Sequence, residues 1–338
     1  MSTITMKTLS APEAAKISTP WTTADIPSQK GRSAIITGTG GIGLETALEL
    51  ARAGAEVIIA GRNPRKGEDA IARIIDEAPS ATVRFEQVDL ASLQSIADFG
   101  ARLRDQRDSL DLLINNAAVM MPPKRQQTQD GLELQFATNY LGHFALTAQL
   151  MPLLCEGEKP RVISLSSVAA RDGIIDFADL QSEHHHKPMR AYSQSKLACL
   201  MFALELQRRS AAGQWGVTSI AAHPGIARTD LLHNAPGRWS AIGTARTLLW
   251  FMFQPASQGA LPSLYAATSP TAKGGSYYGP ASFSETRGAP TTATIPKQAL
   301  DAEAASRLWE ISEHLAGITI PAPREARDVT LEELDDPE

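Results

Sequence analysis

The sequence predicts a single α/β domain, built on a doubly wound parallel sheet of about seven strands with helices on both faces. Three observations lead to this prediction. Short apolar runs rich in β-branched residues alternate with longer segments of helical periodicity. A glycine-rich turn joins the first of these strands to the first helix. Polar residues recur just after the strands, at the edge where the carboxyl ends of parallel strands meet.

The composition is typical of a large globular domain. The chain has 338 residues, of which 43% are hydrophobic, and a formal net charge of -5. It has no lysine- or arginine-rich run, so we expect no nucleic-acid partner. Its longest apolar block, residues 248–253, is far shorter than the roughly 20 residues of a membrane-spanning helix, so we expect no integral membrane segment. Cys155 and Cys199 have no metal-ligand spacing and are interpreted as reduced thiols of a cytoplasmic protein.

The expected organisation is an N-terminal extension, a main domain and a C-terminal tail. The extension covers residues 1–30, the domain 31–320 and the tail 321–338. Trp21 and Ile26 are expected to fasten the end of the extension to the domain. Within the domain, residues 230–256 are irregular and apolar, which indicates either a lid or substrate wall, or plain core packing.

The first strand and helix have the pattern of a dinucleotide-binding turn. Residues 33–37 form an apolar strand, 38–43 are rich in glycine, and a helical pattern starts at Leu44. Glycines let the backbone approach a pyrophosphate, and the helix N-terminus offers free N–H groups and the positive end of the dipole. The residues expected to contact the cofactor here are Thr37, Gly38, Gly41, Ile42 and Gly43.

The end of the second strand, residues 56–60, bears on the choice of cofactor. An NAD site places an Asp or Glu near this point to bind the ribose 2′-hydroxyl. This sequence instead has Arg62 followed by Asn63. Arg62 is either a partner for a 2′-phosphate or an ordinary solvated arginine. We therefore expect NADP(H) rather than NAD(H), with both residues at the site.

The strand and helix pattern continues, and two more strands end in candidate cofactor contacts. The expected elements are a helix at 65–77, a strand at 82–88, a helix at 92–107 and a strand at 110–114. Asp89 and Leu90 follow the third strand, where Asp89 either binds the adenine edge or belongs to the start of the next helix. Asn116 and Ala117 follow the fourth strand, and small residues there would let the backbone close over a cofactor.

A long helix is expected over residues 132–154. It contains Asn139, which is unfavourable inside a helix and is therefore expected to have a polar role in the interior. His143 is more typical of a packed histidine than of a ligand. The fifth strand, 161–165, ends in Ser166 and Ser167, at the same carboxyl edge as the earlier candidates. The run His184-His185-His186 follows in a loop, and adjacent histidines do not converge on one ion, so we predict no metal site.

Tyr192 and Lys196 form the strongest catalytic candidate. In a helix over residues 189–212 the two side chains leave the same face, one turn apart. An ammonium group close to a tyrosine favours the phenolate, and the pair can therefore move a proton to or from an alcohol oxygen.

The remaining elements complete the pattern. A sixth strand at 216–222 leads into a turn with Pro224, Gly225 and Ile226, followed by Thr229, and this turn again faces the cofactor crevice. A helix at 258–268, a last strand at 276–278 and a helix at 302–315 are expected to follow.

Together these residues resemble the short-chain dehydrogenase/reductase family, a Rossmann-type fold, over about residues 30–285. The supporting motifs are Thr37-Gly38 with Gly41-Ile42-Gly43, Asp89, Asn115-Asn116-Ala117, Asn139, Ser167, Tyr192 to Lys196, and Pro224-Gly225 with Thr229. The sequence also resembles the retinol dehydrogenase-like branch of this family. The features that it shares are the long interval from Ser167 to Tyr192 and the sequence motifs at 176–181, 192–198 and 274–280. Two positions depart from the family pattern: the glycine motif is one residue short between Gly38 and Gly41, and Ala118 replaces a usual glycine.

The resemblance implies a role for each catalytic residue. Tyr192 would exchange a proton with the substrate oxygen. Lys196 would favour the phenolate form of Tyr192 and hydrogen-bond the nicotinamide ribose. Ser167 would bind the substrate oxygen and stabilise charge that develops there. Asn139 would hold a water that links Lys196 to solvent.

The expected reaction is hydride transfer between NADP(H) and a small-molecule carbonyl or alcohol, with an apolar substrate indicated by residues 230–256. The Ile226 backbone and the Thr229 hydroxyl would fix the carboxamide. Two alternatives remain: reduction of a C=C bond, as in protochlorophyllide reductase, and a non-catalytic NADP(H)-binding sensor or scaffold. A homodimer is a further expectation.

Overall fold

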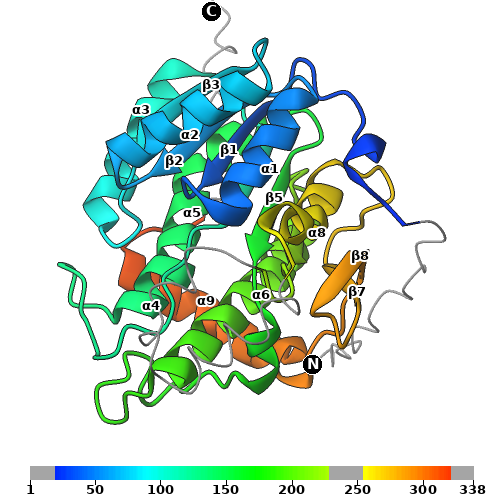
Figure 1. Ribbon diagram of the computed structural model, residues 1–338. Coiled ribbons are helices and arrows are strands. Elements are labelled where there is room, and N and C mark those ends of the chain that lie inside the picture. Colours follow the sequence, from blue (N-terminus) through cyan, green and yellow to red (C-terminus); the bar gives the residue numbers. More distant parts are fainter. Residues whose placement is uncertain (1–19, 228–253, 321–338) are drawn as a thin grey trace, which may run out of the picture.

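The computed structural model describes residues 20–227 and 254–320, and they form an eight-stranded sheet with helices on both faces (Figure 1). The strand order is β3-β2-β1-β4-β5-β6-β7-β8. All neighbours pair in parallel except β7 and β8, which are antiparallel. The predicted doubly wound parallel sheet is confirmed, with one strand more than the approximate count of seven.

The elements alternate along the chain as expected. The strands are β1 (Ser33–Thr37), β2 (Glu56–Gly61), β3 (Thr82–Gln87), β4 (Leu112–Asn115), β5 (Arg161–Leu165), β6 (Thr218–Ala222), β7 (Tyr277–Ser282) and β8 (Arg287–Thr292). The α-helices are α1 (Gly41–Arg52), α2 (Pro64–Glu77), α3 (Leu93–Gln106), α4 (Leu134–Phe136), α5 (Gly142–Cys155), α6 (Pro188–Gly213), α8 (Ala256–Thr268) and α9 (Ala302–Ala316). Short 3-10 turns are η1 (Thr23–Asp25), η3 (Val168–Asp172) and η6 (Lys297–Leu300), and η2 (Ala137–Leu141) is a π-helical turn.

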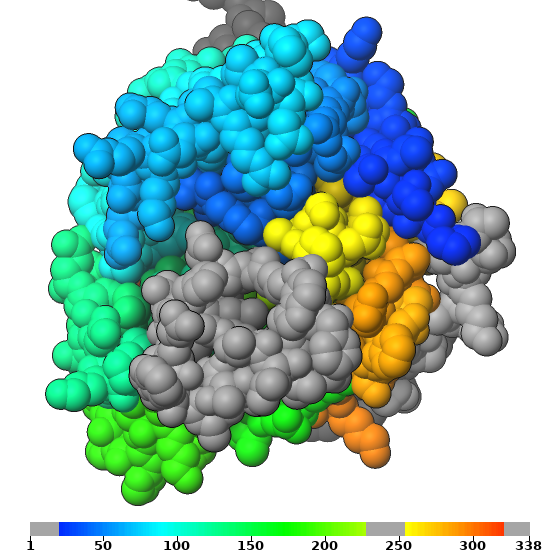
Figure 2. Space-filling view, in the orientation of Figure 1, coloured from blue at the N-terminus to red at the C-terminus, as the bar shows by residue number. Residues whose placement is uncertain are grey.

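The strands are apolar because both faces of the sheet are covered. Successive side chains of a strand point to opposite faces. In β1, Ile35 joins the core under α3, α5 and α6, whereas Ile36 joins the core under α1 and α8. Figure 2 shows α1 (blue) in contact with α8 (yellow) on the second of these faces. The near-continuous apolar runs of the sequence are the expected signature of this double burial.

The end of the predicted N-terminal extension is fastened to this second face. Trp21 is buried, and its ring lies edge-on to Tyr265 of α8 with centroids 5.5 Å apart. In the two described stretches, no helix is both long enough and apolar enough to cross a membrane.

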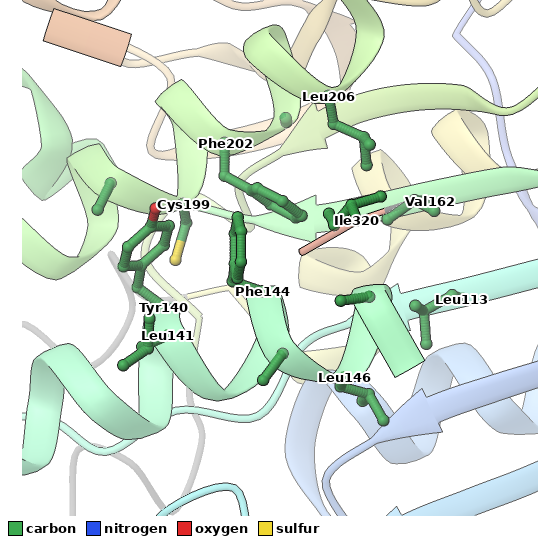
Figure 3. Close-up of a cluster of buried hydrophobic side chains, with 14 of the residues drawn as sticks. Leu113, Tyr140, Leu141, Phe144, Leu146, Val162, Cys199, Phe202, Leu206 and Ile320 are labelled. Carbon is green, nitrogen blue, oxygen red and sulfur yellow. The ribbon is translucent and has the colours of Figure 1, made fainter. Parts of the chain in front are cut away.

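The C-terminal helix α9 closes the opposite face. Trp309 stacks on Phe202 of α6 with centroids 5.8 Å apart and meets Phe144 of α5 edge-on at 5.0 Å. Figure 3 shows Phe144 and Phe202 side by side in this cluster, with Tyr140 beside them. The Tyr140 hydroxyl also bonds the Ser312 hydroxyl of α9 at 2.7 Å. The aromatic surface of α5 and α6 is thus covered by a helix of the same chain.

Replacing Trp309 with alanine is expected to lower the free energy of unfolding by about 3–5 kcal/mol, because the indole is only 2% exposed and its removal leaves a cavity between three helices. Urea denaturation measures this change. Ile174→Ala is the control, since that side chain is 64% exposed and its loss should cost well under 1 kcal/mol. Equal losses in the two variants would contradict the packing described for α9.

Candidate active site

A cleft of about 660 Å³ lies at the carboxyl ends of the strands. Segments from six parts of the chain line it, and most of them were predicted to meet there. The lining residues are Gly38–Ile42, Leu44, Lys66, Asp69, Ala70, Arg73, Asn116–Ala118, Leu165, Ser166, Tyr192, Lys196 and Pro224. The glycine turn and the Tyr-Lys pair, about 150 residues apart in the sequence, therefore share one cavity.

The glycine turn is shaped by close packing against Asn116. A Cβ atom on Gly43 would overlap the side-chain amide of Asn116, and one on Gly38 would lie 2.9 Å from its nitrogen. Gly38 and Gly41 also have φ angles of 101° and 54°, in the left-handed region that favours glycine. Although one residue short, the turn closes onto the neighbouring strand and leads into α1, whose first N–H groups have no partner in the helix.

Thr37 lies beneath this turn rather than in the cleft. Its side chain is fully buried, and its hydroxyl accepts the backbone N–H groups of Asn116 and Ala117, each at 2.9 Å. The Asn116 side chain in turn donates to the Thr37 carbonyl at 2.7 Å. Thr37 thus holds the ends of β1 and β4 together, which differs from the direct cofactor contact expected from the sequence.

His143 connects Thr37 to Asn139. Its Nδ1 lies 2.9 Å from the Asn139 carbonyl and its Nε2 lies 2.9 Å from the Thr37 hydroxyl. A carbonyl only accepts, so Nδ1 carries the proton and Nε2 accepts from Thr37. Burial lowers the pKa of His143 to about 4, which keeps the ring neutral.

The helix predicted over 132–154 is confirmed over residues 134–155, but it contains a π-turn that was not predicted. The chain forms α4, then the π-turn η2, then α5. Asn139 lies in the π-turn, fully buried, and accepts the Val119 N–H at 2.7 Å while donating to the Val119 carbonyl at 3.0 Å. It also donates to the Ser195 hydroxyl of α6 at 2.9 Å. An extra residue in the turn gives these bonds room, as π-turns often do at functional sites.

Tyr192 and Lys196 lie one turn apart on α6 and both line the cleft. The Lys196 ammonium donates to the Leu165 carbonyl at 3.0 Å and lies 6.0 Å from the centre of the Tyr192 ring. Both side chains are buried. An ammonium group and a tyrosine that line the same cleft, one helical turn apart, are suited to proton transfer.

The two serines after β5 have different surroundings. Ser166 lines the cleft, but its hydroxyl donates to the Lys196 carbonyl at 2.7 Å. Ser167 is half-buried and caps η3, where its hydroxyl accepts the Ala169 N–H at 3.2 Å. Ser167 is not among the residues that line the cleft.

The residues predicted to contact the cofactor after β2 and β3 do not line the cleft. Arg62 is exposed, and Asn63 caps α2 by accepting the Lys66 N–H at 3.2 Å. Asp89 accepts the Ala91 N–H at 3.0 Å, in a local turn. Neither these three predicted residues nor Leu90 line the cleft.

Lys66 was missed by the sequence reasoning. It lines the cleft with Arg73, but Arg73 is already paired with Glu45 at 2.7 Å and Glu77 at 2.9 Å. In the described residues, no ion pair involves the Lys66 ammonium. The available signal was its position in the first turn of α2, four residues after Arg62.

The turn after β6 is held by the turn between β7 and β8. Pro224 lines the cleft, and Ile226 donates its N–H to the Thr286 carbonyl at 2.9 Å. Gly225 has a φ of 64°, and a Cβ there would overlap the same carbonyl. Thr229 and residues 230–253 of the predicted lid lie outside the described residues. In residues 20–227 and 254–320, no three His, Cys, Asp or Glu side chains are grouped to hold a metal ion.

A doubly wound sheet with a glycine turn and a Tyr-Lys pair in one cleft is the arrangement of a Rossmann-type oxidoreductase that uses a nicotinamide cofactor. Comparison with known proteins agrees. The model of the short chain dehydrogenase family matches residues 32–238. The chain therefore belongs to the short-chain dehydrogenase/reductase family, as its motifs predicted.

Its relatives include enzymes named for two alcohols. Polyprenol dehydrogenase from Mus musculus is 41% identical over 254 residues, which cover 74% of this chain and 75% of that protein. Retinol dehydrogenase 13 from Homo sapiens is 39% identical over 304 residues, or 87% of each chain. The crystal structure of an uncharacterized protein from Mycobacterium paratuberculosis is 38% identical with a TM-score of 0.74, covering 90% of this chain and all (100%) of that one. The predicted resemblance to the retinol dehydrogenase-like branch is confirmed.

Lowering the pH from about 6.5 to about 4 is expected to reduce the free energy of unfolding by on the order of 1 kcal/mol per pH unit through His143. In this window the unfolded chain binds a proton at this ring and the folded chain does not, so acid favours unfolding. Above pH 6.5 the contribution is constant. Urea denaturation at several pH values measures the slope.

His143→Gln is expected to flatten that slope, whereas His184→Gln, at an exposed site, should leave it unchanged. The buried His223 also has a lowered pKa, because burial outweighs the effect of Glu285, so some slope should remain in the variant. A slope that is the same in wild type and His143→Gln would contradict the assignment of a neutral His143.

Proposed function

We propose that the protein is an NADP(H)-dependent oxidoreductase that transfers hydride between nicotinamide and a carbonyl or alcohol. The observation that carries this proposal is the presence of Tyr192, Lys196 and the glycine turn in one cleft. The family membership supports it, because short-chain dehydrogenases are oxidoreductases.

The cleft has the features that a dinucleotide needs. Gly38, Gly41 and Ile42 would hold the pyrophosphate, since the turn brings the backbone and the N-terminus of α1 to the cleft. Asn116 and Ala117, fixed by Thr37, would cover the middle of the cofactor. When bound, the cofactor supplies or accepts the hydride.

The residues of the chain handle the proton and the charge on oxygen. In the reductive direction the substrate carbon accepts a hydride and its oxygen accepts the Tyr192 proton, which gives an alcohol. The Lys196 ammonium, held by the Leu165 carbonyl, stabilises the tyrosinate that remains. Ser167 would donate to the substrate oxygen, and Asn139 would hold the π-turn in place behind α6.

The substrate is proposed to be apolar. The relatives named for retinol and polyprenol support this choice, since both are long isoprenoid alcohols. Each methylene that such a substrate buries contributes about 0.8 kcal/mol to binding. The homodimer and the cytoplasmic location remain proposals.

The cofactor preference is proposed to depend on Arg62, which directly follows β2, and on Lys66 in the first turn of α2. Arg62→Ala and Lys66→Ala are each expected to weaken NADPH binding about tenfold or more, because a charge-assisted bond to the 2′-phosphate contributes about 1.5–3 kcal/mol. NADH binding should change less than twofold. Fluorescence titration of both cofactors measures the difference.

Arg65→Ala is the matched control for Lys66→Ala, since this neighbouring arginine is exposed and, unlike Lys66, does not line the cleft. Equal weakening of NADH and NADPH by both variants would show that neither cation binds the 2′-phosphate.

Tyr192→Phe is expected to lower kcat for NADPH-dependent reduction of retinaldehyde or decanal by about 100-fold or more, the usual contribution of a general acid. The Kd for NADPH should change less than threefold, since only the hydroxyl is lost. Steady-state kinetics and titration measure the two quantities. With retinaldehyde, which has both kinds of double bond, the product distinguishes C=O reduction, which gives retinol, from C=C reduction, which gives a dihydroretinaldehyde. Wild-type protein that binds NADPH but reduces neither aldehyde would favour the sensor or scaffold alternative.

A further inference from the structure

Glu285 connects three segments, around Arg171, His223 and Thr294, of which the first two are distant from it in the sequence. It lies in the turn between β7 and β8 (Figure 1). Its Oε2 is 3.0 Å from His223 Nε2 and 2.6 Å from a guanidinium nitrogen of Arg171. Its Oε1 accepts the N–H and the hydroxyl of Thr294, each at 2.9 Å. The sequence alone predicts no role for these four residues.

Two of the segments that Glu285 joins carry parts of the candidate active site. Arg171 belongs to η3, the turn that Ser167 caps. His223 directly follows β6 and precedes Pro224, which lines the cleft. One carboxylate thus connects the segment of the proposed substrate-binding serine with the segment beside the proposed nicotinamide site.

The direction of the bond to His223 is fixed. Gly225 donates its N–H to His223 Nδ1 at 3.2 Å, so Nδ1 accepts and Nε2 carries the proton that is donated to Glu285. The His223 ring is fully buried and packs against the ring of Tyr277, with ring centres 5.0 Å apart. The Tyr277 hydroxyl donates to the Ser167 carbonyl at 3.3 Å, which gives a second link between the two segments.

The backbone of the turn is unusual in a way that indicates a function. Phe283, Ser284 and Glu285 have φ angles of 50°, 56° and 65°, so three successive non-glycine residues adopt the left-handed conformation. Such residues are unfavourable and persist where the surroundings hold them, often near functional sites. Here Arg171 also donates to the Ser284 carbonyl at 3.1 Å, and the turn is held through its side chain and its backbone.

The carboxylate is strongly stabilised in its charged form. Burial raises the pKa of Glu285, but the hydrogen bonds from His223 and Thr294 outweigh it and lower the pKa to about 2. Glu285 therefore stays ionised and paired with Arg171 throughout the neutral range.

We propose that Glu285 is a positioning residue, which acts through Arg171 and His223 to hold the Ser167 segment and the Pro224-Gly225 turn at the separation that hydride transfer requires. The proposal rests on the function proposed above. It adds a residue that lies outside the cleft and touches neither the substrate nor the cofactor.

The test replaces the carboxylate with an amide of the same shape, Glu285→Gln, in the full-length protein. We expect kcat for reduction of decanal by NADPH to fall about tenfold, and the Kd for NADPH to change less than threefold. We also expect the primary isotope effect with 4-deuterated NADPH to rise, because a misaligned hydride transfer becomes rate-limiting. A partly unfolded enzyme would lose activity without a change in the isotope effect. Glu285→Asp should recover part of the rate.

Two further variants complete the test. Arg171→Gln removes the guanidinium that pairs with Glu285. Its side chain is 37% exposed, and the variant should reproduce the effects of Glu285→Gln. The double variant should be no slower than the slower single variant, because both changes break one connection. Glu56→Gln is the matched control, since Glu56 pairs with Arg107 at 2.7 Å at the opposite, amino end of the sheet, and its kinetics should match wild type.

The results separate this proposal from the proposed function. An active wild type whose kcat and isotope effect are unchanged in Glu285→Gln and Arg171→Gln overturns the positioning role alone. Strictly additive losses in the double variant overturn it as well. If Glu285→Gln does not fold, the isotope effect in Arg171→Gln decides. Absence of any wild-type reduction of decanal or retinaldehyde overturns the proposed function itself.

Discussion

The candidate site depends on the hydrogen bonds that the buried Thr37 hydroxyl makes. It receives two backbone N–H groups from the segment after β4 and bonds the His143 ring. His143 in turn bonds the carbonyl of Asn139 in the π-turn. Three segments are therefore held by one oxygen atom in the interior, where an unpaired polar group would be costly. The network explains why a threonine ends β1 and why a histidine is buried in α5.

This network reaches the proposed catalytic pair without entering the cleft. Asn139 bonds Ser195, the residue just before Lys196, and Lys196 itself bonds the end of β5. The helix that carries Tyr192 is thus fixed relative to β1, β4 and β5 by hydrogen bonds behind the cavity. Proton transfer depends on small differences in distance and angle, so rigid support of this kind serves the proposed chemistry.

Much of the fold was predictable because burial on both sides of the sheet makes its strands apolar. β8 was not predicted, because it contains Gly288 and Pro290 and lies at an edge, where an apolar run is not required. The π-turn was not predicted either, since one extra residue barely alters the apolar spacing of 132–154. For the site, the glycine turn and Tyr192 follow from local motifs. Lys66 and Glu285 do not, because an exposed lysine in a helix and a glutamate in a hairpin have no local pattern of their own.

The position of α9 affects how the chain matures. The aromatic surface of α5 and α6 is complete once residue 213 has been made, but Trp309 and Ser312 cover it only about a hundred residues later. During synthesis this surface is exposed to other chains and to chaperones, as is usual for folding intermediates of large domains. A nascent chain stalled before α9 would carry a complete glycine turn on one face of the sheet and an uncovered aromatic surface on the other.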